Sequence, residues 1–305
     1  MIMASRAILK NPNGLFLGVP GSGKSFAVKR EIIDNFLKTL DDIFISDPEG
    51  EYFPLVNRLG GQVIKISSDS KDFINPMDIN IEPMEGEDLI ANKSSFILSL
   101  CELIAGGKIG LEPIERSAID FAVRKVYEKF YANNPSEETM PTLADLHKEL
   151  KKLDNAKRVA DSMDMYVTGS HKFFNNRSNV DINNRLVCFD VKDLNLELRK
   201  IGMLIIQDAV WNKVAKNRYN GTKTWYYMDE FHLLLQHEQT ASYSVEMWKR
   251  FRKWNGFPTG ITQNIKDLLQ TQQIESIFDN TDFICMLSQA DGDRDIIMNK
   301  KNLSK

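Results

Sequence analysis

Residues 14–25 read GLFLGVPGSGKS, an apolar run followed by a glycine-rich segment that ends in Lys24 and Ser25. The stretch from Gly18 to Ser25 matches the pattern GxxxxGK[ST] in full. Glycines let the backbone turn tightly, so that successive N–H groups can point at phosphate oxygens. The pattern therefore predicts that Lys24 reaches the β- and γ-phosphates of a nucleotide and that the Ser25 hydroxyl holds Mg²⁺.

The surroundings of this loop are those that a phosphate site needs. The apolar run at 14–17 predicts a strand, and 24–39 has helical character, so the dipole of the helix would face the same anion. The β-branched runs at 42–46 and 62–66 predict two more strands. Together these elements read as strand–helix–strand–turn–strand, the opening of an α/β sheet.

Beyond residue 85 the pattern changes and then returns. Strand signals stop between about 86 and 165, where Thr142 and Asp145 have the spacing of a helix cap, and we expect an all-helical insertion at 85–165. Further strands are predicted at 185–191, 224–228, 257–262 and 282–287, with helices at 196–217 and 243–254 between them. The sequence thus predicts an α/β nucleotide-binding domain at 1–84 and 166–305, with a mostly parallel sheet covered by helices on both faces.

Composition excludes several classes of protein. The 305 residues carry a net charge of −3, so no global basic field indicates a nucleic-acid partner, and any such contact would be local. Cys101, Cys188 and Cys285 lie far apart in apolar runs and are expected to be buried thiols of a reducing compartment. With four histidines and no CxxC or HExxH pattern, a dedicated metal cage is not expected. The absence of a run of about 18 apolar residues and of a signal-peptide core predicts a cytosolic-type chain.

The predicted strand at 224–228 ends in two carboxylates, Asp229 and Glu230. Asp229 is in the right place to orient Mg²⁺, through water, as the second half of the metal site. Glu230 would then lie near the γ-phosphate and polarise the attacking water as general base. The alternative is that both are solvated acids at the end of a strand.

Two other strand ends carry polar candidates. Gln263, followed by Asn264, comes after the strand at 257–262, at the edge where α/β sheets place their ligands, and could sense the γ-phosphate; a helix-capping amide is the alternative. The segment from Asp47 to Tyr52 follows the strand at 42–46 and has turn chemistry. A turn is the better interpretation on physical grounds, with a role for Glu51 around the nucleotide left open.

A basic cluster lies on the predicted helix at 243–254. Trp248 and Phe251 are three residues apart and are expected to face the core. The basic residues on its other faces are Lys249, Arg250, Arg252 and Lys253. Three interpretations stay open: a solvated face, an arginine finger inserted into the site of a neighbouring subunit, and contact with a nucleic-acid backbone.

The order of these motifs is recognisable. It runs NPNGLFLGVPGSGKSFAVKREI (11–32), ISDPEGEY (45–52), INPMDI (74–79), YYMDEFHLLL (226–235), the basic helix and GITQN (260–264). This order resembles the VirB/TraC/TrbE family of conjugation and type IV secretion ATPases, in the HerA/FtsK branch of RecA-like motors. The DEFHLL form is most similar to versions from Gram-positive bacteria and their mobile elements.

The resemblance implies a RecA-like P-loop fold, with ATP and Mg²⁺ as cofactors and Mg²⁺-dependent ATP hydrolysis. It assigns the nucleotide to Gly18, Pro20, Gly21, Ser22, Gly23, Lys24, Ser25, Phe26, Asp229 and Glu51, and the metal to Ser25 and Asp229. The catalytic groups it implies are Glu230, Lys24 and the sensor Gln263, together with Arg252 and Lys253 acting on an adjoining subunit.

The resemblance also implies a setting. It indicates a hexameric motor that powers channel or pilus assembly and substrate transfer with other secretion-system subunits, in the cytoplasm and peripheral to the inner face of a bacterial cell membrane. Whether DNA is moved and whether the isolated chain is a monomer stay open. The family carries a large N-terminal domain, so we expect a C-terminal ATPase fragment here. The alternatives are a HerA/FtsK-like or coupling-protein-type DNA translocase and a nucleotide-gated scaffold without turnover.

Overall fold

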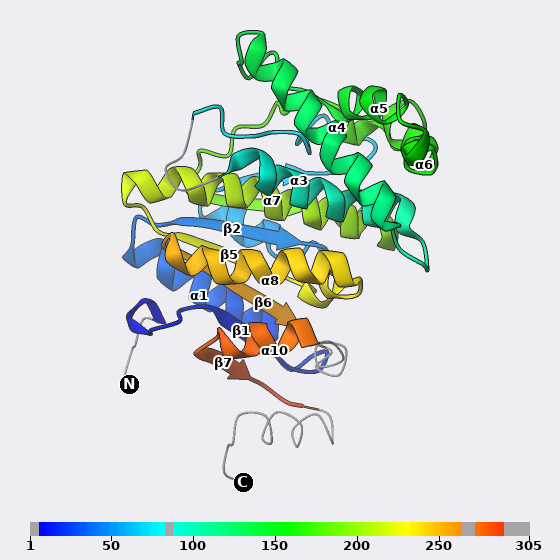
Figure 1. Ribbon diagram of the computed structural model, residues 1–305. Helices are drawn as coiled ribbons and strands as arrows, with labels where there is room; N and C mark the ends of the chain where they lie inside the picture. Colours follow the sequence, from blue (N-terminus) through cyan, green and yellow to red (C-terminus); the bar gives the residue numbers. More distant parts are fainter. Residues whose placement is uncertain (1–5, 83–87, 264–271, 290–305) are drawn as a thin grey trace. The chain divides into compact units, whose positions relative to one another are not determined.

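The computed structural model describes residues 6–82, 88–263 and 272–289, which form two compact units (Figure 1). The sheet unit comprises 1–63, 183–190 and 214–305, and the helical unit comprises 64–182 and 191–213. Strand β3 (Gln62–Lys65) and helix α7 (Leu196–Asn220) pass from one unit into the other.

Among the described residues, seven strands form one sheet in the order β3-β4-β2-β5-β6-β1-β7, with neighbouring strands parallel. The strands other than β3 are β1 (Gly14–Leu17), β2 (Asp42–Asp47), β4 (Leu186–Asp190), β5 (Thr224–Met228), β6 (Gly256–Thr262) and β7 (Phe283–Met286). The helices of this unit with described bounds are α1 (Lys24–Lys38), α2 (Phe53–Arg58), α8 (Glu238–Lys253) and α10 (Gln272–Asp279). The predicted α/β architecture is confirmed.

Helices cover both faces of the sheet because consecutive strand residues point to opposite sides. Tyr227 faces α1, where its hydroxyl accepts a hydrogen bond of 3.0 Å from Asn35. Its neighbour Tyr226 faces α8 and stacks on Phe251 with 6.1 Å between ring centroids. As expected, Trp248 and Phe251 are both buried. Figure 1 shows α1 and α8 beside the central strands.

One element between β2 and β3 differs from the prediction. The sequence predicts a turn there, but residues Phe53–Arg58 form the short helix α2. Pro54 lies in its first turn, where the fixed φ of proline suits a helix and no N–H partner is lost. The segment was too short for a helical period to be recognised.

The helical unit contains α3 (Leu89–Cys101), α4 (Pro113–Ala132), α5 (Leu143–Leu150), α6 (Lys157–Val167) and the first part of α7. Thr142 caps α5 as expected, and its N–H donates to the Asp145 carboxylate at 2.8 Å. The predicted insertion at 85–165 lies within this unit. The unit itself is larger and comprises residues 64–182 and 191–213.

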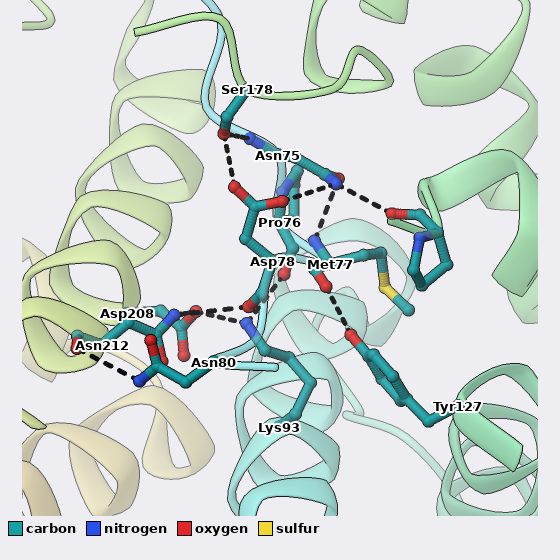
Figure 2. Close-up of polar contacts among 11 residues, drawn as sticks. Asn75, Pro76, Met77, Asp78, Asn80, Lys93, Tyr127, Ser178, Asp208 and Asn212 are labelled. Carbon is teal, nitrogen blue, oxygen red and sulfur yellow. Dashed lines mark hydrogen bonds and ion pairs between the residues drawn. The ribbon is translucent and has the colours of Figure 1, made fainter. Parts of the chain in front are cut away.

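The segment INPMDI at the start of the helical unit is held by its neighbours (Figure 2). The Asn75 side-chain amide donates to the Asp78 carboxylate at 2.9 Å and to the main-chain oxygen of Pro141 at 2.8 Å. The Tyr127 hydroxyl of α4 donates to the main-chain oxygen of Met77 at 2.5 Å. These bonds satisfy main-chain and side-chain groups of a segment that has no helix or strand of its own.

A buried ion pair lies beside the same segment. Lys93 of α3 pairs with Asp208 of α7 and also donates to the main-chain oxygen of Pro76 at 3.1 Å (Figure 2). The two charged side chains are 2% and 8% exposed, so each depends on the other for compensation. The pair therefore fastens INPMDI to two helices of its own unit.

One described helical stretch, Leu89–Gly106, is long and apolar enough to cross a membrane by length and composition alone. It is not a continuous apolar run, because Lys93 and Glu102 lie within it. Half of the stretch is buried in the structure, and the core helices of other proteins meet the same criterion.

The three cysteines are free thiols, as expected. Cys101 and Cys188 are buried, and burial raises the pKa of each thiol. Cys285 is only partly buried, which corrects the prediction for that residue, because β7 lies at the end of the sheet order.

Candidate functional site

The phosphate loop joins β1 to α1, as the sequence predicts. Gly21 and Gly23 have φ values of 75° and 91°, a left-handed conformation that only glycine adopts without strain. At position 18 a Cβ atom would come within 2.5 Å of the Ser22 hydroxyl, so the loop also needs a glycine there for space. The loop geometry thus depends on the three glycines of the motif.

The Lys24 side chain is hydrogen-bonded to the backbone of this loop. Its Nζ atom donates to the main-chain oxygens of Gly18 at 2.7 Å and Val19 at 3.1 Å. The buried hydroxyl of Ser22 has no hydrogen-bond partner among the described residues. An ammonium group and unused donors around a glycine loop are the chemistry that binds a phosphate group. Pro20 within the loop and Phe26 directly after it are exposed, Phe26 by 73%.

The other predicted groups lie at the ends of neighbouring strands. Four neighbouring strands lie in the order β2-β5-β6-β1. Strand β2 ends at Asp47, β5 is followed by Asp229 and Glu230, β6 by Gln263, and β1 by the phosphate loop. The structure therefore brings four distant parts of the chain to one edge of the sheet, where parallel α/β proteins bind ligands. Asn264, named with Gln263 in the sequence analysis, lies outside the described residues.

Asp229 is almost fully buried at 5% exposure. Its N–H donates to the main-chain oxygen of Ser46 at 3.1 Å, and its carboxylate accepts the N–H of Glu230 at 2.9 Å. Burial, and after it the nearby Glu230 charge, raise the pKa of Asp229 to about 8. Ionisation of Asp229 would place a negative charge in a buried position, and a bound cation would stabilise that charged form.

Glu230 is held by both the backbone and its neighbours. Its φ of 47° lies in the left-handed region, uncommon for a residue with a side chain. Gln263 donates through Nε2 to its Oε1 atom at 2.8 Å, and Nδ1 of His232 lies 3.1 Å from its Oε2 atom. The predicted base and the predicted sensor are thus in direct contact.

Tyr52, which the sequence does not single out, lies near the same carboxylates. Its hydroxyl is fully buried and makes no well-formed hydrogen bond with the described residues. Burial raises the pKa of Tyr52 well above the usual tyrosine value, and nearby carboxylates, Asp229 foremost, raise it further. The Ser25 hydroxyl faces the same group and lowers that pKa. The Tyr52 hydroxyl therefore lies close to Ser25 and Asp229, the predicted metal-binding pair.

The segment from Asp47 to Tyr52 is a turn, as its residues predict. The Asp47 carboxylate accepts the N–H groups of Glu51 at 2.9 Å and Tyr52 at 2.8 Å, and Gly50 has a φ of 70°. Glu51 is exposed, and its charge is among those that raise the pKa of Asp229. The turn thus places Glu51 near the acidic pair.

The donors at this edge fit Mg²⁺ when a nucleotide supplies the remaining ligands. No group of three His, Cys, Asp or Glu side chains within the described ranges could hold a metal alone. Ser25 offers a hydroxyl, Asp229 a buried carboxylate, and the unpartnered Tyr52 hydroxyl can bond a metal-bound water. Mg²⁺ is commonly bound in this way, by one or two protein oxygens, water and phosphate oxygens.

Arg252 and Lys253 do not lie near the phosphate loop of their own chain. They are exposed at the end of α8, just before β6 begins at Gly256, whereas Gln263 follows the other end of β6. A seven-residue strand is about 20 Å long. The two basic residues therefore lie at the opposite edge of the sheet from the phosphate loop.

Comparison with known proteins gives the family. Residues 2–298 match the model of the TraG P-loop domain. The chain belongs to the TraG P-loop domain family. A search of curated protein sequences gives no significant match.

Solved structures show the same fold. VirB4 of Thermoanaerobacter pseudethanolicus superposes with a TM-score of 0.82 at 22% identity, covering 97% of this chain and 82% of that one. The bacterial conjugative coupling protein TrwB superposes with a TM-score of 0.59 at 13% identity, covering 89% and 68%. TrwB in complex with the ATP analogue ADPNP gives 0.61 at 14% identity, covering 89% and 69%. The fold is therefore that of a P-loop NTPase of the VirB4 and TrwB type, and the predicted family resemblance is confirmed.

His232, like Tyr52, is not among the site residues that the sequence predicts. Both residues follow predicted site residues closely, His232 two positions after Glu230 and Tyr52 one after Glu51. Their side chains, however, form no pattern of their own. One sequence signal could have indicated them: each residue follows closely after a strand that ends in acidic residues.

Proposed function

We propose that this chain is the ATP-hydrolysing motor of a conjugative or type IV secretion system, powering channel or pilus assembly and substrate transfer. The observation that carries the hydrolytic part is the contact of Glu230 with Gln263 at the sheet edge that also holds the phosphate loop. The type of system is supported by the TraG P-loop family and by the likeness to VirB4 and to the conjugative coupling protein TrwB.

The loop and its lysine bind the nucleotide in this proposal. Main-chain N–H groups between Gly18 and Ser25 surround the β-phosphate, and Lys24 moves from the carbonyls of its own loop to the β- and γ-phosphates. Ser25 and Asp229 would hold Mg²⁺, which would neutralise charge at the phosphate oxygens.

Glu230 activates the attacking water as general base, and Gln263 senses the γ-phosphate. Because the Gln263 amide already donates to Glu230, a movement of Gln263 toward the phosphate changes the position of the base. Sensing and activation are thus linked through one hydrogen bond.

The remaining predicted groups act in an assembly. Arg252 and Lys253 are exposed and remote from the loop of their own chain, as residues that enter the site of an adjoining subunit must be. We propose a hexamer in which these residues, with Glu51 and Phe26, complete the nucleotide site. The motor would work in the cytoplasm, at the inner face of a bacterial cell membrane. Within it, residues 1–84 and 166–305 are the RecA-like domain and 85–165 the all-α insertion.

Steady-state ATP hydrolysis by the wild-type chain and Glu230→Gln tests this proposal. The wild type should turn over ATP in Mg²⁺, and Glu230→Gln should bind ATP with similar affinity but lose at least about 100-fold in turnover. Undiminished hydrolysis by Glu230→Gln would refute the assignment of the base. Negligible wild-type turnover at every protein concentration would support a nucleotide-gated scaffold instead.

A DNA translocase is the second candidate. The likeness to the coupling protein TrwB favours it, and the net charge of −3 argues mildly against tight DNA binding by this chain. Salt-dependent DNA binding together with ATPase activity that DNA raises several-fold would favour the translocase. Activity indifferent to DNA would favour the secretion motor.

A further inference from the structure

The backbone at Glu230 is in a conformation that needs support. With φ 47° and ψ 40°, Glu230 lies in the left-handed region, at a cost of about 1 kcal/mol for a residue with a Cβ atom. Its main-chain oxygen accepts the N–H of Leu233 at 2.9 Å, in the short helix η5 (Phe231–Leu235). Strained residues of this kind persist where surrounding contacts hold them, often at functional sites.

Two side chains lie against the Glu230 carboxylate, one at each oxygen. Gln263 donates to Oε1 at 2.8 Å, while Nδ1 of His232 lies 3.1 Å from Oε2. The same Nδ1 atom is 3.3 Å from the Thr262 hydroxyl, so the imidazole is itself located by the end of β6. The side chains of Glu230 and His232 are both 14% exposed, which strengthens polar contacts between them.

The two carboxylate oxygens are not equivalent. Oε1 accepts a hydrogen bond from the Gln263 amide, whereas the buried Oε2 receives no well-formed hydrogen bond from the described residues. Oε2 therefore keeps the capacity to accept a hydrogen bond from water. The last torsion of a glutamate is broad, so a group beside Oε2 is needed to limit its rotation.

We propose that His232 is a positioning residue for Glu230: its Nδ1 atom, located by Thr262, fixes the carboxylate so that Oε2 faces the attacking water. This inference rests on the proposed function. In the reaction, the water proton passes to Oε2 and the water oxygen forms the new bond to the γ-phosphorus. The bond between that phosphorus and the bridging oxygen breaks, and ADP leaves. His232 acts only through Glu230.

A pair of substitutions separates positioning from packing. His232→Asn keeps a side-chain nitrogen close to the place of Nδ1, whereas His232→Leu keeps volume without a polar atom. We expect His232→Leu to lower kcat about 10- to 100-fold, because small misplacements of catalytic groups have effects of that size. The KM for ATP and the affinity for a fluorescent ATP analogue should change less than about twofold. His232→Asn should recover at least tenfold of the lost kcat.

Two results would overturn the proposal: kcat of His232→Leu within about twofold of wild type, or a loss that His232→Asn does not recover. His232→Ala replaces the leucine variant if that variant does not fold, as judged by circular dichroism. Glu230→Gln, measured in parallel, separates this inference from the proposed function. If Glu230→Gln is inactive and His232→Leu fully active, only the role of His232 is wrong. If Glu230→Gln is active, the base assignment itself is wrong.

Discussion

Asp229 and Glu230 are adjacent in sequence but have different environments. Asp229 continues the burial of β5, and its carboxylate is bonded to the backbone of its neighbour. Glu230 turns away through a left-handed backbone and meets Gln263 and His232. Two carboxylates whose surroundings differ in this way suit different roles, one at a metal and one in proton transfer.

Asp229→Asn should raise the free energy of unfolding at pH 8 without nucleotide or Mg²⁺. The folded protein keeps a proton on Asp229 up to about pH 8, whereas an unfolded aspartate loses it near pH 4. Because only the unfolded state loses this proton between those values, the free energy of unfolding falls progressively as pH rises from about 4 to about 8. Urea unfolding should show a gain of about 1–3 kcal/mol at pH 8 and none at pH 4. A loss of stability at pH 8 would contradict this environment for Asp229.

Tyr52→Phe removes the unpartnered hydroxyl and should leave the fold as stable or more stable by about 1 kcal/mol. It should also weaken binding of a fluorescent ATP analogue several-fold in Mg²⁺ but not in EDTA, because the hydroxyl faces the metal-binding pair. Tyr226→Phe is the matched control, since its hydroxyl bonds Ser46 at 2.8 Å. That variant should lose about 1 kcal/mol of stability and keep its Mg²⁺ dependence. Equal behaviour of the two variants would rule out a metal-linked role for Tyr52.

At the scale of elements, hydrogen bonds hold the segment INPMDI (74–79) against its neighbours in the helical unit. The Asn75 side chain donates hydrogen bonds to Asp78 within the segment and to the main-chain oxygen of Pro141. Two side chains from helices donate to main-chain oxygens of the segment: Tyr127 of α4 to Met77, and Lys93 of α3 to Pro76 (Figure 2). Every one of these contacts lies within the helical unit. The motif therefore has a structural explanation that requires no ligand.

Lys93→Met should lower the free energy of unfolding by about 3–5 kcal/mol, because it leaves Asp208 charged and buried without its partner. The double variant Lys93→Met/Asp208→Asn should recover part of that loss. Lys125→Met on α4 is the control, since Lys125 forms an exposed pair with Glu128 and should cost less than about 1 kcal/mol. Urea unfolding measures all three. A loss below about 1 kcal/mol for Lys93→Met would contradict the importance of the buried pair.

At the scale of the whole molecule, two predicted catalytic groups lie away from the phosphate loop of their own chain. The described part of the chain brings Lys24 to the phosphate loop, while Arg252 and Lys253 lie at the opposite edge of the sheet. A phosphoryl-transfer site commonly gains an arginine from a second subunit. Assembly and activity should therefore be linked.

Specific ATPase activity should rise with protein concentration, so that total activity increases faster than linearly. Arg252→Ala should remove this rise and lower activity at least about tenfold, while ATP binding by the isolated chain stays unchanged. Lys249→Ala, an exposed basic residue of the same helix, is the control and should behave like wild type. Linear activity that Arg252→Ala leaves unaltered would contradict the role of Arg252 in an adjoining subunit.

The sequence predicts local features of the molecule better than contacts between distant parts. The phosphate loop, the cap at Thr142 and the strand at 224–228 follow from residues close in the chain, and all three are confirmed. The contact of Glu230 with Gln263 spans 33 residues, and the approach of Tyr52 to Asp229 is longer still, so only the folded sheet brings these groups together. The helix α2 was missed because six residues contain less than two helical turns.

A crystal structure of the chain with Mg²⁺ and a non-hydrolysable ATP analogue tests the central claim most directly. We predict that the phosphates lie in the Gly18–Ser25 loop with Lys24 on the β- and γ-phosphates, that Ser25 and Asp229 hold the metal, and that Glu230 faces the γ-phosphate. Phosphates bound outside the loop, or a Glu230 carboxylate directed away from the γ-phosphate, would contradict the account.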